Sequence, residues 1–126
     1  MSEHPNATIV RESLDAANRN DLAGAAEFLA DDVEWHEIGR AEPIRGKAAL
    51  AGMYGSAAAP DFTITAEAHD IVANDDHVIA LVTAHATRGG KELTYRTAEI
   101  FHVSDGKITA RWAFSDDTAA IVNFFA

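Results

Sequence analysis

The sequence predicts one α+β domain in which helices come first and a largely antiparallel sheet follows. In the first half, apolar residues recur at helical spacing. In the second half, apolar and polar residues alternate as in strands, and short turn sequences separate the alternating segments. Helices followed by hairpin-linked strands are typical of the α+β class. With 126 residues, the chain is expected to form a single domain, residues 1–126, that buries a real core.

Three helices are expected before the strand-rich half. The first follows a loose arm that ends near Asn6. The second lies between a capping pair at 20–21 and an acidic pair at 31–32, which should stop it. The third begins near Lys47, after the loop 39–46. The residues expected on the inner faces of these helices are Val10, Leu14, Ala17, Leu22, Ala25, Ala26, Leu29, Leu50, Met53, Tyr54 and Ala57.

The strands are predicted from alternation. Residues 33–38 alternate between apolar and polar and indicate a short strand between the second and third helices. The remaining strands are expected at 62–68, 78–87, 93–103 and 108–114, with turns at 74–76, 89–90 and 104–106. The tail from Asp116 ends in large apolar residues and should dock on the domain. A strongly curved sheet covered by the helices would leave a cone-shaped cavity.

Composition excludes several functions. The formal net charge of −10 argues against nucleic acid and anionic membranes as partners, and leaves a small neutral or cationic ligand compatible. The chain has no cysteine, so a disulfide framework and a thiol nucleophile are impossible. No His-x-His, His-Glu-x-x-His or Gly-x-Ser-x-Gly spacing occurs, and we expect neither a metal nor a cofactor. Because the N-terminus lacks a secretory signal, a soluble cytoplasmic protein is expected.

Glu37 is the first candidate catalytic residue. Side chains two residues apart share one face of a strand, so Val33, Trp35 and Glu37 should point the same way. The first two are apolar, and this face should therefore look into the protein. A carboxylate held in an apolar interior can act as a general base. The alternative is that Glu37 lies at the end of its strand and reaches water.

Glu99 is the second candidate. It shares one face of its predicted strand with Tyr95, Thr97, Phe101 and Val103. Two interpretations remain open at this point. Glu99 can serve in the chemistry of the cavity, or it can belong to a structural polar network or an ion pair with an arginine.

The order of these elements resembles the ketosteroid-isomerase branch of the NTF2-like superfamily, which also contains the SnoaL-like polyketide cyclases and limonene-epoxide hydrolases. Two segments carry the resemblance, NDLAGAAEFLADDVEWHEIGRAEPIRGKAALAGMY at 20–54 and AEIFHVSDGKI at 98–108. The resemblance implies a cone of three N-terminal helices packed on a strongly curved, largely antiparallel sheet. It also places Glu37 where the steroid isomerases keep their catalytic aspartate.

The same resemblance assigns further residues. With a one-residue gap, Glu99 takes the place of a second aspartate, which stays protonated in that family and donates a hydrogen bond to the developing oxyanion. Tyr54 falls where a tyrosine supports these bonds. Strand parity and the resemblance together give an expected cavity lining of Trp35, Met53, Val82, Ala84, Tyr95, Phe101, Trp112 and Phe114.

Two positions depart from the family pattern. Ser13 stands on the first helix, where the oxyanion-hole tyrosine is expected. Since an oxyanion hole is usually the largest catalytic contribution, steroid isomerisation itself is in doubt. Phe114 stands where the epoxide hydrolases should have a further aspartate, which disfavours epoxide hydrolysis.

Two functions therefore remain open. One is a cofactor-independent isomerase or cyclase that acts on a small, mostly apolar carbonyl compound, with Glu37 as base and Glu99 and Tyr54 polarising the carbonyl. The other is a non-catalytic ligand-binding or scaffold module. For both we expect a homodimer formed through the exposed face of the sheet, with Ile100 and Ala113 on that face.

Overall fold

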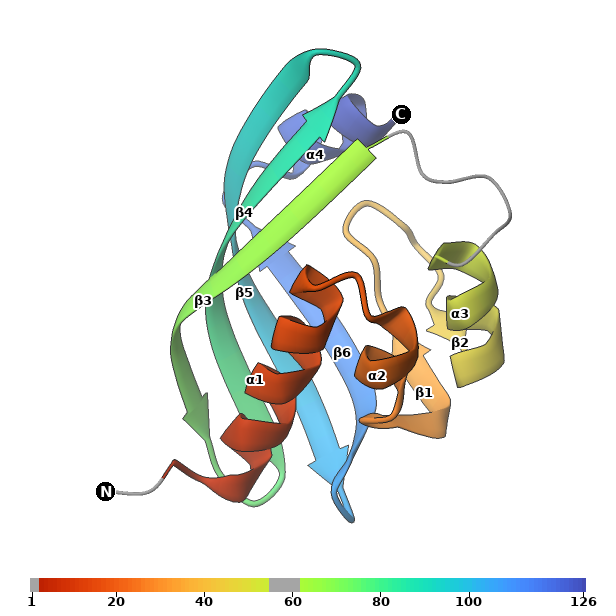
Figure 1. The fold of residues 1–126 in the computed structure, drawn as a ribbon, viewed down its shortest axis with the longest axis vertical. Helices are drawn as coiled ribbons and strands as arrows, with labels where there is room; N and C mark the ends of the chain where they lie inside the picture. Colours follow the sequence, from red (N-terminus) through yellow and green to blue (C-terminus); the bar gives the residue numbers. More distant parts are fainter. Residues whose placement is uncertain (1–2, 55–61) are drawn as a thin grey trace.

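A curved six-stranded sheet and four helices make up the part of the chain described by the computed structural model, residues 3–54 and 62–126 (Figure 1). The helices are α1 (Pro5–Asn18), α2 (Leu22–Ala26), α3 (Lys47–Tyr54) and α4 (Thr118–Phe125). The strands are β1 (Leu29–Trp35), β2 (Ile44–Arg45), β3 (Phe62–Ala73), β4 (His77–Arg88), β5 (Lys91–Ser104) and β6 (Lys107–Ser115). None of the helices in these two ranges is long and apolar enough to cross a membrane.

The sheet has the order β2-β1-β6-β5-β4-β3. The four long strands form an antiparallel meander, and β1 pairs with β6 in parallel, so the sheet is mixed and mostly antiparallel. The predicted glycine turn between β4 and β5 is present, with Gly89 and Gly90 at φ of 56° and 81°. Positive φ costs little at glycine, which explains why the chain reverses there.

The helices before the long strands cover one face of the sheet (Figure 1). In α1, Pro5 stands in the first turn, where its missing N–H is not needed. In α2, the Asp21 side chain accepts a hydrogen bond from the Gly24 N–H and caps the helix. The predicted end of this second helix at 31–32 is wrong. The chain already enters β1 at Leu29, which pairs with Ile108 of β6.

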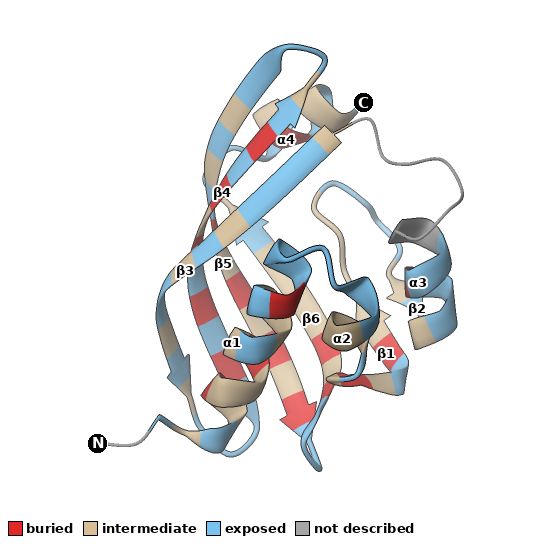
Figure 2. Ribbon diagram, viewed as in Figure 1, coloured by how far each residue is buried: buried red, intermediate tan, exposed pale blue. Residues whose placement is uncertain are grey.

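The core lies between α1 and the inward face of β4 and β5 (Figure 2). Along β4 every second residue from Val78 to Ala86 is buried, as predicted from alternation. Phe101 and Val103 of β5 and Val10 of α1 are buried against the same face. Each fully buried Val or Phe side chain stabilises the fold by roughly 1.5–3 kcal/mol.

The C-terminal tail docks as predicted, and it does so as the helix α4. Asp117 caps its start by accepting a hydrogen bond from the Ala120 N–H. Arg88 of β4 donates to the carbonyl oxygens of Phe124 and Ala126 at 3.0 and 2.8 Å, which satisfies the end of the helix. A strand between α2 and α3 was expected; the short β2 and the closing helix α4 are additional elements.

A bulge in β6 changes which residues point inward. His102 pairs with Ala110 and Val103 pairs with Ile108, so Thr109 is an extra residue in β6. Beyond the bulge, Arg111 lies opposite the buried Phe101. The bulge therefore brings Arg111 to the inner face of the sheet.

The expected positions of three β6 residues are therefore wrong. Ala113 lies opposite the buried Glu99 on the inner face, not on the outer face. Trp112 and Phe114 lie on the outer face, not in the cavity lining. Trp112 stacks there on His36 with ring centroids 4.8 Å apart, and Phe114 is 59% exposed.

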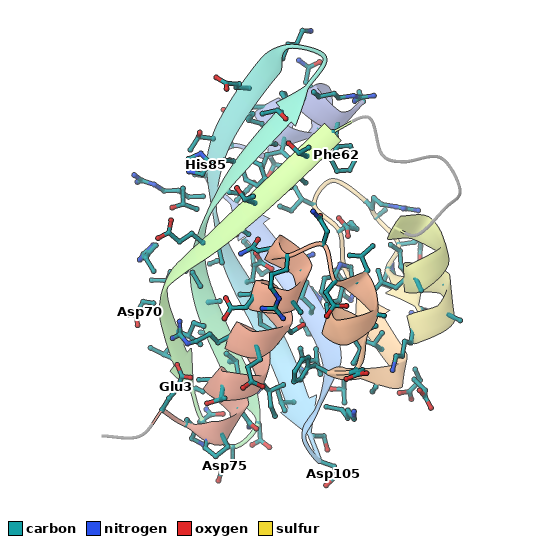
Figure 3. The ribbon with its side chains drawn as sticks, in the orientation of Figure 1. Glu3, Phe62, Asp70, Asp75, His85 and Asp105 are labelled. Carbon is teal, nitrogen blue, oxygen red and sulfur yellow. The ribbon has the colours of Figure 1, made fainter. Side chains whose placement is uncertain are left out.

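Acidic side chains project from the periphery, consistent with the net charge. Glu3, Asp70, Asp75 and Asp105 all lie exposed near the ends or edges of elements (Figure 3). Glu3 is paired with Arg11 of α1 at 2.7 Å.

Candidate functional site

The candidate site lies on the inward face of the sheet, where β5, β6 and the end of β1 meet. It is built from Glu99, Thr97 and Tyr95 of β5, Arg111 of β6, Trp35 of β1, and Glu37 just beyond β1. The register explains this grouping. Trp35 of β1 pairs with Arg111 of β6. The next residue of β6 on the same face, Ala113, pairs with Glu99 of β5.

Glu99 forms a buried ion pair with Arg111. Nη2 and Nε of Arg111 donate to Oε1 of Glu99 at 2.9 and 3.1 Å, and the side chains are only 12% and 9% exposed for Arg111 and Glu99. The Thr97 hydroxyl donates to the other carboxylate oxygen at 3.1 Å. Every oxygen of this carboxylate therefore has a protein donor. The arrangement is the ion pair with an arginine that the sequence left open, and both carboxylate oxygens are already engaged within the protein.

Arg111 also holds the end of β1. Its Nη1 donates to the His36 carbonyl oxygen at 3.1 Å, and its guanidinium carbon lies 4.6 Å from the centre of the Trp35 ring. A guanidinium over an indole is attracted by the ring and stacks well on it. Arg111 thus links Glu99 to Trp35.

Trp35 in turn orients Glu37. The indole N–H of Trp35 donates to Oε1 of Glu37 at 2.9 Å, and both side chains are half-buried. The two side chains therefore lie together, although β1 ends at Trp35 and Glu37 lies beyond the strand, not within it as predicted. Contacts run without a break from Glu99 through Arg111 and Trp35 to Glu37.

The charges of both carboxylates, Glu99 and Glu37, affect the pKa of Tyr95. It is half-buried on the inner face of β5, opposite the buried Ala84 of β4. Burial raises the pKa of Tyr95 above its ordinary value. The negative charges of Glu99 and, to a smaller extent, Glu37 raise the pKa further, whereas Arg111 lowers it. The phenol therefore stays protonated at neutral pH and is a hydrogen-bond donor.

The other predicted site residues fall into three groups. Val82, Ala84 and Phe101 are buried on the inner face of the sheet. Met53 and Tyr54 stand at the end of α3, and their side chains lie outside the described part of the structure. Ser13 does not take the place of an oxyanion-hole tyrosine, because its hydroxyl donates to the Ala25 carbonyl of α2 at 3.4 Å.

Sequence reasoning missed Arg111 and Thr97 as site residues. Thr97 was placed on the correct face but given no role. Arg111 was overlooked because uninterrupted alternation along β6 would point it outward. A signal for it was available, since an arginine in the middle of the closing strand is a natural counter-ion for a buried glutamate.

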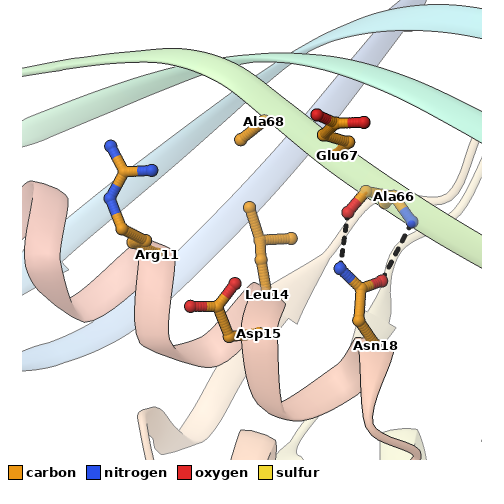
Figure 4. A pocket seen from close by; sticks show the side chains of 7 residues that line it. All are labelled: Arg11, Leu14, Asp15, Asn18, Ala66, Glu67 and Ala68. Atoms are coloured by element: carbon orange, nitrogen blue, oxygen red, sulfur yellow. Dashed lines mark hydrogen bonds between the residues drawn. The ribbon is translucent and has the colours of Figure 1, made fainter.

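A shallow groove between α1 and β3 is separate from this site (Figure 4). Its lining consists of Arg11, Leu14, Asp15, Asn18, Ala66, Glu67 and Ala68. Asn18 binds the backbone of Ala66 through both amide atoms, at 2.6 and 2.9 Å. The groove thus marks where α1 is tied to the edge strand.

No group of three or more His, Asp or Glu side chains within 3–54 and 62–126 is arranged to hold a metal ion. The residues that the site offers are instead proton carriers and hydrogen-bond donors. A carboxylate, a phenol and a guanidinium beside apolar walls can bind a small molecule and move a proton on it.

Comparisons with known proteins agree with this fold. The family model of the SnoaL-like domain matches residues 10–111. An uncharacterised protein of Mycobacterium tuberculosis is 34% identical over 138 aligned positions, which cover all of both chains. An NTF2-like protein of unknown function from Burkholderia pseudomallei superposes with a TM-score of 0.85 at 20% identity, covering 98% of this chain and 99% of that one. A Δ5-3-ketosteroid isomerase from Mycobacterium sp. gives 0.75 at 22% identity, covering 89% and 93%.

Proposed function

The chain belongs to the SnoaL-like domain family, with an NTF2-like fold, and we propose that it is a cofactor-independent isomerase or cyclase. Its substrate would be a small, mostly apolar compound with an enolisable carbonyl, bound on the inner face of the sheet. The observation that carries this proposal is the oriented Glu37 carboxylate, held at 2.9 Å by the Trp35 indole beside an apolar wall.

Glu37 is the proposed general base. A base is effective when its carboxylate is held in one orientation, because the geometry of proton transfer is then set before the substrate arrives. The Trp35 N–H supplies that orientation from one side. Half-burial keeps the carboxylate near apolar groups and still accessible to a ligand.

Glu99 has a different proposed role from the one implied by the family resemblance. Its two oxygens are engaged by Arg111 and Thr97, so it serves to position Arg111. Arg111 then supports the Trp35 ring, and Trp35 supports the base. Tyr54, the third residue implied by the resemblance, keeps its proposed supporting role without a structural account.

The test is exchange of α-protons in D₂O, followed by proton NMR, on β,γ-unsaturated ketones and 1,3-diketone mimics of polyketides. This assay reports enolisation whatever the final product. Glu37→Gln should slow exchange by about 10²–10⁴-fold, the usual contribution of a general base. Glutamine can still accept the Trp35 hydrogen bond, so the fold should be kept. Glu42→Gln, an exposed change in the same loop, is the matched control and should exchange at the wild-type rate. Equal rates in the two variants would reject Glu37 as the base.

A second candidate, a ligand-binding module without turnover, is favoured by two contacts. The Ser13 hydroxyl donates a hydrogen bond to the Ala25 carbonyl of α2, so it is not directed at a ligand. Both oxygens of the Glu99 carboxylate accept hydrogen bonds from Thr97 and Arg111. This alternative predicts no exchange with any ketone of the panel, while Glu37→Gln changes only the affinity for a ligand. Clear exchange by the wild-type protein would reject it.

We also propose that two copies pair through the outer face of the sheet. A row of apolar residues crosses four strands there, since Val72 pairs with Ile79, Ile79 with Ile100, and Ile100 with Trp112. Val72 is 54% exposed, and such a row gains free energy when a second copy covers it. Light scattering of the wild-type protein should give twice the monomer mass of 13.5 kDa. The Ile100→Glu variant should give the mass of a single chain. A wild-type mass of one chain would refute the dimer.

A further inference from the structure

Within the described ranges, no residue accepts a hydrogen bond from the Tyr95 hydroxyl. Its side chain lies half-buried on the inner face of β5, the face that also carries Thr97 and Glu99. The Thr97 hydroxyl donates a hydrogen bond to the Glu99 carboxylate, and Arg111 also donates to that carboxylate. In contrast, the Tyr95 hydroxyl makes no hydrogen bond to any residue within the described ranges. The hydroxyl of a half-buried tyrosine with no acceptor in these ranges is able to donate a hydrogen bond to a ligand on this face of the sheet.

Within the described part of the sheet, Tyr95 has a small cross-strand partner on one side and no paired residue on the other. On one side its partner in β4 is Ala84, which presents only a methyl group. On the other side the pairing of β5 with β6 extends only to Thr97 and Ser115, so no β6 side chain pairs with Tyr95. Tyr95 therefore has no large cross-strand partner among the described strands, and just after β6 Asp116 hydrogen-bonds the backbone of the adjoining Arg96.

The charges around Tyr95 fit a reaction in which negative charge moves from the base to the substrate. As the proposed base, Glu37 enters the reaction as a carboxylate, and Glu99 is paired with Arg111. When Glu37 takes the α-proton, the C–H electron pair forms the C=C bond of an enolate, and the carbonyl π pair becomes a lone pair on oxygen. The total charge in the site is unchanged, and it now sits on the substrate oxygen.

We propose that the Tyr95 hydroxyl donates a hydrogen bond to the ligand oxygen on which this charge develops. Tyr95 of β5 would thus provide the hydrogen-bond donor to the oxyanion, a role that Ser13 of α1 does not fill because its hydroxyl donates to Ala25. The ligand class is then a carbonyl compound that forms an enolate, or a phenolate that resembles one. This inference rests on the proposed function of Glu37 as the base.

The first test uses the free protein and needs no ligand. The difference between the alkaline absorbance titrations of wild type and Tyr95→Phe isolates the ionisation of Tyr95, because the chain has only two tyrosines. The Tyr95 midpoint should lie above the ordinary value of about 10. Removal of the Glu37 charge by Glu37→Gln should lower the midpoint, whereas Glu42→Gln should not. A midpoint that does not respond to Glu37→Gln overturns the proposal, since the two groups would not share one site.

The second test measures binding of 4-nitrophenolate as an enolate mimic, by its absorbance change. Loss of a hydrogen bond to a charged oxygen should weaken binding by about 10–100-fold in Tyr95→Phe. Thr94→Val, which removes a hydroxyl from the opposite face of β5, should bind like wild type. Failure of the wild-type protein to bind the probe, or equal binding by Tyr95→Phe, overturns the proposal.

The outcomes for Tyr95 and Glu37 can be separated. If Glu37→Gln exchanges α-protons at the wild-type rate while Tyr95→Phe loses affinity for 4-nitrophenolate, the base is wrong and Tyr95 stands as a binding donor. If Glu37→Gln stops exchange while Tyr95→Phe exchanges and binds like wild type, the base stands and the role of Tyr95 is rejected.

Discussion

Arg111→Met should destabilise the protein by about 3–5 kcal/mol, because it leaves the Glu99 carboxylate buried without its cation. In the wild-type protein the two side chains are 12% and 9% exposed, so little water can replace the lost partner. After the substitution, the Thr97 hydroxyl is the one side-chain donor to this carboxylate that remains among the residues of 3–54 and 62–126. Since domains of this kind are stable by about 5–15 kcal/mol, the loss would be a large share of the total.

The assay is urea unfolding at neutral pH, monitored by tryptophan fluorescence and circular dichroism. Arg45→Met is the matched control, because Arg45 contacts Glu34 at the same distance of 2.9 Å but is 71% exposed. A surface pair of this kind contributes about 0–1 kcal/mol. The contrast between the two variants therefore compares a buried arginine, which also contacts the His36 carbonyl and the Trp35 ring, with an exposed one.

A double variant separates the cost of an orphaned charge from the value of the pair. Replacing a buried ion pair by apolar residues is often neutral or stabilising by about 1–4 kcal/mol. Glu99→Leu combined with Arg111→Met should thus recover most of the stability that Arg111→Met loses. The reasoning would be refuted if Arg111→Met unfolded within about 1 kcal/mol of the wild type, or if the double variant were no more stable than the single one.

Three further predictions concern the pH dependence of stability, the backbone conformation at Gly39, and the hydrogen bonds between Asn18 and the edge strand. Because the folded protein holds the Tyr95 proton more tightly than the unfolded chain, the stability from this proton is complete below about pH 10 and is lost as pH rises through the raised pKa. Urea unfolding of Tyr95→Phe should therefore show a smaller loss of stability above that pH; identical profiles would contradict this. Gly39→Ala should destabilise by about 1–2 kcal/mol, because φ is +83° and a Cβ would lie 2.4 Å from Val122, so a wild-type melting temperature would be unexpected. Asn18→Ala should lose about 1–3 kcal/mol and aggregate faster by light scattering, since both bonds to Ala66 of the edge strand disappear; an unchanged aggregation rate would argue against this protection.

Much of the fold followed from local pattern. The alternation along β4 and β5 correctly predicted which side chains point inward, because successive side chains of a strand point to opposite faces. The turn at Gly89 and Gly90 was equally predictable, since both residues need positive φ. The lengths of the helices were less predictable. The second helix ends early because Leu29 is drawn into pairing with β6, a contact far away in the sequence.

The site was only partly predictable for the same reason. The sequence by itself determined that Glu99 and Tyr95 share the inward face of β5, because this is a property of a single strand, whereas Glu37 lies beyond the end of β1. Only the tertiary structure decided the rest. The extra residue Thr109 reverses the parity of β6 and brings Arg111 to Glu99. A bulge depends on how two strands pair, so the partner of a buried charge is settled only when the sheet is assembled.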